Sequence, residues 1–205
     1  MNINHENKPL SKKKFFLPKK MIIIGTSGSG KTTFGNNLSK LLKIPCTDLD
    51  NLYWLPNWQK REENDFFNHF KEKLNSEHWI FCGNYTQYLQ RIWCQADTII
   101  WLDLPLMTCL WRALKRSIYR IIKLETCCNG NYETVDRLCG KDSILLWIWN
   151  SYSRRKKDYE EAFSCASDQN FVRLCNDQQI KAFVDSIKRA TLYCDPLSPH
   201  YPDNP

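Results

Sequence analysis

Eight residues near the N-terminus combine glycines, a lysine and a hydroxyl group in a spacing that binds phosphate. Residues 25–32 read Gly-Thr-Ser-Gly-Ser-Gly-Lys-Thr, which matches the loop pattern G-x-x-x-x-G-K-[ST]. Because glycine lacks a Cβ, such a loop can fold tightly and aim its backbone N–H groups at phosphate oxygens. The lysine then reaches the terminal phosphates, and the hydroxyl after it binds Mg²⁺. The predicted nucleotide-binding residues are Gly25, Ser27, Gly28, Ser29, Gly30, Lys31, Thr32 and Thr33.

The surroundings of this loop agree with the motif. The apolar run 21–24 precedes it as a predicted buried strand, and apolar residues at helical spacing follow it from Phe34 to Leu42. The positive end of that helix dipole would also favour phosphate. We therefore predict ATP and Mg²⁺ as cofactors, and Lys31 as a catalytic residue that neutralises the transferred phosphoryl group.

Acidic residues stand at the ends of two other predicted strands. Asp48 and Asp50 are two positions apart, so along an extended chain both point to the same side. We predict Asp48 near the metal and Asp50 as the group that accepts a proton from an acceptor hydroxyl. Asp103 ends the apolar strand 98–103 and is a second candidate metal residue beside Thr32. The alternatives are a polar loop entry for the pair and a helix N-cap for Asp103.

Arginines are the expected partners of a transferring phosphoryl group, because they bind phosphate oxygens bidentately and stabilise developing charge. A spacing of four places two of the candidates on one helix stripe, and two others flank a predicted lid. A solvated helix face is the alternative for the stripe. The predicted catalytic arginines are Arg91, Arg112, Arg116, Arg154 and Arg155.

Aromatic side chains follow the acidic pair closely. Tyr53, Trp54 and Trp58 are placed to stack on a base or a sugar ring of the acceptor, or else to pack within the loop itself.

Composition bounds the class of protein. With 205 residues and 42% hydrophobic content, the chain should form one domain with an inserted lid. No apolar run approaches the roughly 20 residues that span a bilayer, and no signal peptide is evident, so we expect a cytoplasmic protein without a membrane partner. The ten cysteines are then expected as reduced thiols. A structural zinc at Cys127, Cys128 and Cys139 is an alternative, although paired C-x-x-C spacing is absent.

The net charge of +7 comes mostly from one segment. Residues 1–20 hold six lysines and one acid, which leaves +2 for the rest of the chain. Such tails are usually solvated, so DNA is only weakly supported as a partner, and the oligomeric state cannot be read from the sequence.

Strands alternating with helices predict an α/β fold with a parallel sheet covered on both faces. The phosphate loop, the acidic pair, residues 83–85 and Asp103 would then meet at the carboxyl edge of that sheet. We expect a flexible basic extension over 1–19, a domain over 20–190 with a lid at about 124–140, and a disordered tail over 191–205. The predicted strands are 20–24, 44–49, 79–82, 98–103 and 171–174; the predicted helices run from the loop to about 43 and over 62–75, 106–123, 142–163 and 177–190.

Beyond these signals, the chain resembles the bacterial topology modulation protein family, a group of adenylate-kinase-like P-loop proteins. The resemblance covers about residues 21–187. It rests on the phosphate loop and on segments 49–54 (Leu-Asp-Asn-Leu-Tyr-Trp), 83–85 (Gly-Asn-Tyr), 96–103 (Ala-Asp-Thr-Ile-Ile-Trp-Leu-Asp) and 147–150 (Trp-Ile-Trp-Asn).

The resemblance implies a three-layer α/β/α P-loop NTPase fold with sheet order 2-3-1-4-5, a mobile helical lid and kinase activity. It also implies acceptor or phosphate contacts for Asp50, Arg91 and Arg112. One departure concerns Cys82, which stands where an Asp or Glu is expected in relatives and where that acid helps to organise Mg²⁺. Its absence shifts that role to Asp48, Asp50 or Asp103, or weakens catalysis.

The leading hypothesis is therefore an ATP-dependent kinase that transfers the γ-phosphoryl group to a small acceptor, such as a nucleoside or nucleotide. The alternative is a nucleotide-binding regulator of DNA topology with weak or no turnover. A degraded kinase retained as an interaction protein is a third reading, which depends on Cys82 alone.

Overall fold

A computed structural model describes residues 17–164 and 170–194. Its centre is a five-stranded parallel sheet with the order β2-β5-β1-β6-β9, which confirms the predicted α/β class and the order 2-3-1-4-5. The strands are β1 Lys20–Gly25, β2 Cys46–Asp48, β5 Trp79–Cys82, β6 Thr98–Leu102 and β9 Asn170–Leu174.

The central strand β1 is buried on both sides, which explains its unbroken apolar sequence. Ile22 and Ile24 point to one face of the sheet, whereas Met21 and Ile23 point to the other. The alternation divides the apolar core into two clusters, one under each layer of helices.

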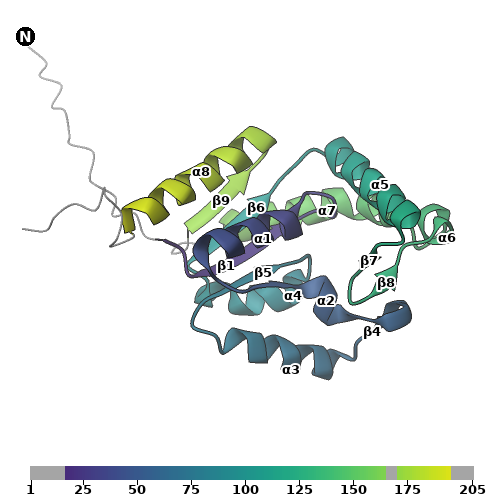
Figure 1. Ribbon diagram of the computed structural model, residues 1–205, viewed down its shortest axis with the longest axis horizontal. Helices are drawn as coiled ribbons and strands as arrows, with labels where there is room; N and C mark the ends of the chain where they lie inside the picture. Colours follow the sequence, from purple (N-terminus) through teal and green to yellow (C-terminus); the bar gives the residue numbers. More distant parts are fainter. Residues whose placement is uncertain (1–16, 165–169, 195–205) are drawn as a thin grey trace, which may run out of the picture.

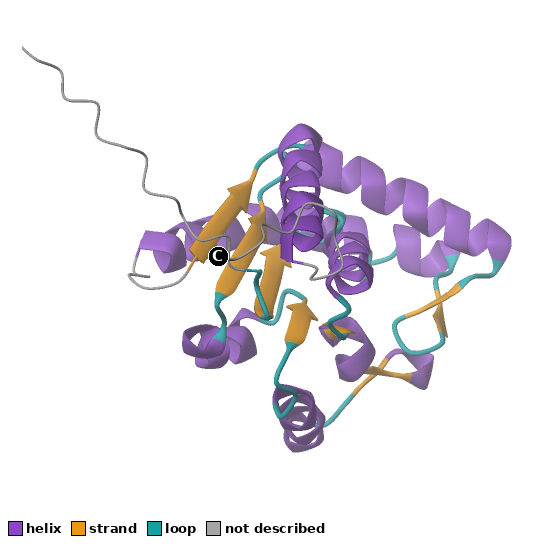
Figure 2. Cartoon of the chain, turned by 60° about the vertical axis from the view of Figure 1, so that its left-hand side comes forward, coloured by secondary structure: helices purple, strands orange, loops and turns teal. Residues whose placement is uncertain are grey.

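Helices cover both faces of the sheet, as Figures 1 and 2 show. On the Ile22 face lie α3 Glu63–Leu74, α4 Thr86–Leu89, the 3-10 helix η2 Gln90–Gln95 and α7 Ile144–Ser164. On the Met21 face lie α1 Lys31–Leu42 and α8 Asp177–Cys194. The helix α8 continues four residues beyond its predicted end at 190, so the predicted disordered tail begins too early, and residues 195–205 lie outside the described residues.

A lobe beside the sheet is built on α5 Leu106–Lys123, which packs against α7 through Cys109, Ala113 and Ile148. Beyond α5 the chain forms a hairpin of β7 Thr126–Cys127 and β8 Asn131–Tyr132, followed by α6 Val135–Cys139. These elements lie together at the right of Figure 1 and correspond to the segment predicted as a lid.

The aromatic segment after β2 is also ordered. It comprises α2 Leu49–Tyr53, β3 Trp54–Leu55, the 3-10 helix η1 Pro56–Trp58 and β4 Gln59–Lys60. The prediction that the strand reaches residue 49 is wrong, because the Asp48 side chain accepts the Asp50 N–H and caps α2, which ends the strand there.

Helix α1 approaches the sheet closely at Gly35. A Cβ at this position would overlap Cys82 Sγ and would lie 2.9 Å from Cys46 Sγ, and these two sulfur atoms are 3.5 Å apart.

We expect Gly35→Ala to lower the free energy of unfolding by about 1–3 kcal/mol through overpacking. The roughly 1 kcal/mol that alanine gains over glycine in a helix reduces this loss. Urea denaturation of Gly35→Ala, Cys82→Ala and the double variant checks this. The double variant should lose less free energy of unfolding than the two single variants lose together, because Cys82→Ala makes room for the new methyl group. Additive losses would contradict the expectation.

Candidate functional site

The loop between β1 and α1 adopts the conformation that its glycines make possible. Gly25, Gly28 and Gly30 have φ angles of 146°, 83° and 92°, in the region that favours glycine. A Cβ at Gly28 would also overlap the backbone carbonyl of Cys109. The loop is thus folded tightly over the start of α1, as the motif predicts.

Lys31 is held inside the loop. Its side chain is largely buried, and Nζ donates a hydrogen bond to the Thr26 carbonyl at 3.0 Å. Burial lowers the pKa of Lys31 to about 8, although the charges of Asp50 and Asp48 oppose this shift. Among the described residues no carboxylate forms an ion pair with Lys31. The ammonium group therefore needs an anion, and a phosphate group would supply one.

Asp48 and Thr32 meet at the start of α1. Thr32 Oγ1 donates to Asp48 Oδ2 at 2.6 Å, and Asp48 Oδ1 accepts the Asp50 N–H at 3.0 Å. Burial, and then the nearby charge of Asp50, raise the pKa of Asp48, while the Thr32 hydrogen bond opposes the rise. Two acids so close together favour a bound cation.

This oxygen pair fits a hydrated Mg²⁺ ion. Mg²⁺ binds one or two protein oxygens and otherwise retains waters or takes substrate phosphate oxygens. No group of three or more His, Cys, Asp or Glu side chains in ranges 17–164 and 170–194 is placed to hold a metal without such help. Thr32 and Asp48 are therefore the residues that would hold Mg²⁺ here.

Asp50 is positioned by the chain that follows β5. Tyr85 OH donates to Asp50 Oδ1 at 2.9 Å, and burial, with the charge of Asp50, raises the pKa of Tyr85. The neighbouring Asn84 Nδ2 donates to Ser27 Oγ of the phosphate loop at 3.2 Å. The predicted convergence of the Gly-Asn-Tyr segment on the loop and the acidic pair is thus visible in the geometry.

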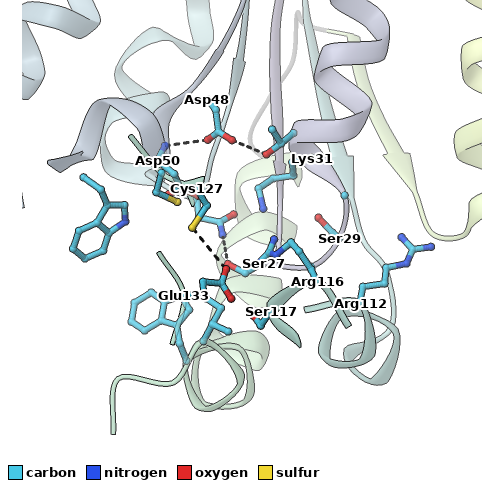
Figure 3. A pocket seen from close by; sticks show the side chains of 18 of the residues that line it. Ser27, Ser29, Lys31, Asp48, Asp50, Arg112, Arg116, Ser117, Cys127 and Glu133 are labelled. Atoms are coloured by element: carbon cyan, nitrogen blue, oxygen red, sulfur yellow. Dashed lines mark hydrogen bonds between the residues drawn. The ribbon is translucent and has the colours of Figure 1, made fainter. Parts of the chain in front are cut away.

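These groups line one cleft of about 1630 Å³. In Figure 3, Lys31, Ser27 and Arg116 point into a common space, with Asp48 and Asp50 on one side and Arg112 on the other. Pockets for a single drug-sized ligand typically measure roughly 300–1,000 Å³, so this cleft has room for a donor and an acceptor together. It is lined by seven predicted nucleotide-binding residues, Ser27, Gly28, Ser29, Gly30, Lys31, Thr32 and Thr33, and by the aromatic residues Tyr53, Trp54 and Trp58.

Four of the five predicted arginines line the cleft in different ways. Arg112 forms an ion pair with Asp177 at 2.6 Å near the start of α8. Arg155 donates to the Asn84 carbonyl at 3.4 Å, and its charge contributes to the lowered pKa of Lys31, which places it near that lysine. Arg116 and Arg154 form no ion pair with a described carboxylate and remain available to an anionic ligand.

Three predicted site residues do not line this cleft: Gly25, at the end of β1, Arg91 and Asp103. Arg91 lies over the Phe67 ring, 5.9 Å from its centroid. Asp103 accepts hydrogen bonds from Arg173 and lies 3.8 Å from Lys156 Nζ. The alternative of Asp103 as a helix N-cap is wrong, because the cap position of α5 is Pro105 and no side chain bonds there. Neither Arg91 nor Asp103 is brought to Thr32.

The hairpin of β7 and β8 contributes residues that were not predicted. Asn131 is buried; its Oδ1 accepts the Trp58 N–H at 2.7 Å, and its Nδ2 donates to the Leu55 carbonyl at 2.9 Å. Asn129 Nδ2 donates to the Trp54 carbonyl at 3.1 Å. The hairpin is therefore fixed to the aromatic segment and forms a wall of the cleft. The Asn129-Gly130 dipeptide, a strong hairpin signal, could have revealed it.

The lowered pKa of Lys31 predicts how ATP affinity depends on pH. Below about pH 8, Lys31 of the free protein carries the positive charge that binds phosphate. Above about pH 8, Lys31 is neutral in the free protein and must take up a proton before it binds phosphate. ATP affinity should fall above pH 8 by up to about tenfold per pH unit. Calorimetry between roughly pH 6.5 and 9.5 checks this, with Lys31→Arg as the control that keeps its charge and should show a flat profile. A wild-type affinity that is constant over this range would contradict the expectation.

Among the comparisons with known proteins, only the solved structures bear on the fold. No family model matches the chain. It is 32% identical over 91 residues to the uncharacterized protein YqaC of Bacillus subtilis; this match takes in 43% of the chain and 51%, about half, of that relative. Shikimate kinase from Acinetobacter baumannii, solved in complex with shikimate, is 15% identical, with a TM-score of 0.52 over 85% of this chain and 93% of that one. Shikimate kinase from Bacteroides thetaiotaomicron is 16% identical, with a TM-score of 0.50 over 85% and 98%.

At these identities the solved structures show only that the chain shares the fold of the two shikimate kinases. Membership of the topology modulation protein family stays a prediction. None of the described helices is long and apolar enough to cross a membrane.

Proposed function

We propose that the protein is an ATP-dependent kinase that phosphorylates a hydroxyl or phosphate group of a small acceptor. The observation that carries the proposal is the single cleft in which the phosphate loop and Lys31 face Asp50. A protein that only binds a nucleotide needs no carboxylate in the cleft besides Asp48 at the metal site. A cleft of about 1630 Å³ also leaves room for two ligands.

In this proposal the loop N–H groups and Lys31 bind the β- and γ-phosphates of ATP. Arg155, close to Lys31, and Arg116, which pairs with no described carboxylate, stabilise the charge that develops on the transferred group. Mg²⁺, when bound at Thr32 and Asp48, would supply further charge neutralisation.

Asp50 orients the acceptor. Tyr85 occupies Asp50 Oδ1, and no described residue bonds to Oδ2, which is left for the acceptor. For a hydroxyl acceptor, its oxygen bonds to the γ-phosphorus as the bond to the bridging oxygen of ADP breaks, and its proton passes to the Asp50 carboxylate.

The test is ATP consumption by the purified protein with Mg²⁺, measured across a panel of nucleosides, nucleotides, sugars and small hydroxy acids. Stimulation by one acceptor class, with one phosphorylated product per ADP, supports the proposal and identifies the substrate class. ATP binding without stimulation by any acceptor would overturn it and favour a nucleotide-binding regulator.

A further inference from the structure

One end of the molecule exposes most of its large apolar side chains. Among the side chains whose burial the structure describes, twelve large hydrophobic ones are exposed; eleven lie between 107 and 149, and the other is Leu192. They belong to α5 and its C-cap, the hairpin, α6 and the start of α7, which lie beyond the sheet on the right of Figure 1. Two of them, Leu146 and Trp147, line the cleft described above. Apolar side chains gathered in this way mark an interaction surface more often than scattered ones do.

Helix α5 carries the most regular part of this surface. At 100° per residue, Met107, Trp111, Ile118 and Ile122 fall within about 60° of one another and form a stripe about 22 Å long. Their exposed fractions are 69%, 57%, 43% and 71%. The opposite face of α5, with Cys109, Ala113 and Ser117, is buried, so the exposed stripe is not needed for the core.

The charges on α5 are all of one sign. The helix has five basic residues and no acidic residue. Arg112 and Arg120 form ion pairs with Asp177 and Glu133, and Arg116 lines the cleft. The remaining two, Lys115 and Lys123, are exposed. Lys115 borders the stripe, with its Nζ 4.7 Å from the Trp111 ring centroid, and Lys123 is the last residue of the helix.

A second copy of the chain is a poor match to this surface. If two α5 helices packed antiparallel along their stripes, Met107 would face Ile122 and Trp111 would face Ile118. Lys115, close to the centre, would then lie beside its own counterpart, and two like charges in an apolar contact are unfavourable.

In contrast to the expectation from the sequence that there is no membrane partner, we infer that the α5 stripe docks on an anionic lipid surface. Apolar side chains with an interfacial tryptophan and flanking lysines are the features of helices that lie in the headgroup region of a membrane. A fluid bilayer also accommodates an exposed helix face without a preformed groove. This binding is separate from the proposed kinase activity, because none of the four stripe residues lines the cleft.

Flotation of the full chain with lipid vesicles tests the inference. Binding is expected to vesicles that contain phosphatidylglycerol, to be weak with phosphatidylcholine alone, and to fall as salt is raised. Ile118→Ser with Ile122→Ser should weaken it by at least about tenfold, and Lys115→Glu with Lys123→Glu should do likewise. Leu192→Ser is the matched control, since Leu192 is 61% exposed on α8 and should have no effect. Unchanged ATP binding shows that the variants are folded.

Three outcomes would overturn the inference. The first is the absence of binding to anionic vesicles. The second is binding that survives both α5 variants but is lost when residues 1–16 are deleted, which would assign it to the lysine-rich segment. The third is a dimer, detected by light scattering and abolished by the Ile118 and Ile122 changes, without vesicle binding, which would assign the stripe to a second copy.

Discussion

Replacing Lys31 by methionine should reduce acceptor-stimulated phosphoryl transfer by roughly 10³-fold, because a positioned charge on the transferring group is removed from a buried site. The Lys31 side chain is 9% exposed and bonds to the Thr26 carbonyl, so water cannot readily replace its ammonium group. Methionine has a similar length and suits the buried position, so the fold should persist. Initial rates of ADP formation with the identified acceptor provide the measurement.

The matched control for this variant is Lys40→Met, which makes the same chemical change on the same helix, at a position that does not line the cleft. Its activity should equal that of the wild type. If Lys31→Met retained more than about a tenth of the activity, the loop would not be holding the transferred phosphate, and the kinase proposal would lose its main support.

The sheet and the phosphate loop could be predicted because their signals are local. A buried parallel strand needs an apolar run, and the glycine pattern prescribes one backbone path. The close contact of Asp48 with Thr32 also follows from the fold, since β2 and β1 end at the same edge and only β5 lies between them.

The positions of Arg91 and Asp103 could not be predicted in this way, because side-chain direction at the end of an element depends on its neighbours. The Asp103 N–H donates to the Leu174 carbonyl, which continues the pairing with β9, and the carboxylate meets Arg173 on that strand. Nothing in the local sequence around Asp103 indicates an arginine 70 residues away.

The segment at about 124–140 was predicted as a lid. In the structure this segment contains a hairpin, which is held to the aromatic segment by hydrogen bonds from Asn129 and Asn131. Those bonds reach backbone carbonyls 75 and 76 residues away, so only the turn itself was readable from the sequence.

Asp50→Asn should separate acceptor chemistry from nucleotide binding. The amide keeps the shape of the carboxylate but cannot accept a proton, so transfer to a hydroxyl acceptor should fall by roughly 10²–10⁴-fold. ATP affinity should change little, because Lys31 and the loop remain and the Thr32–Asp48 contact does not involve the Asp50 side chain. Calorimetry for ATP, and kcat and KM for the acceptor, measure the two effects separately.

Tyr85→Phe is the informative companion to Asp50→Asn. It removes only the hydroxyl that donates to Asp50 Oδ1, so the carboxylate stays but is less firmly oriented. We expect a smaller loss in kcat, about tenfold, because positioning is impaired while the acceptor of the proton remains.

Equal losses in ATP affinity and in kcat for Asp50→Asn would show that Asp50 serves the nucleotide. An unchanged kcat for Asp50→Asn would show that the acceptor needs no base. Either result would move the acceptor site away from Asp50, whereas a loss confined to transfer would place it beside the Asp50–Tyr85 pair.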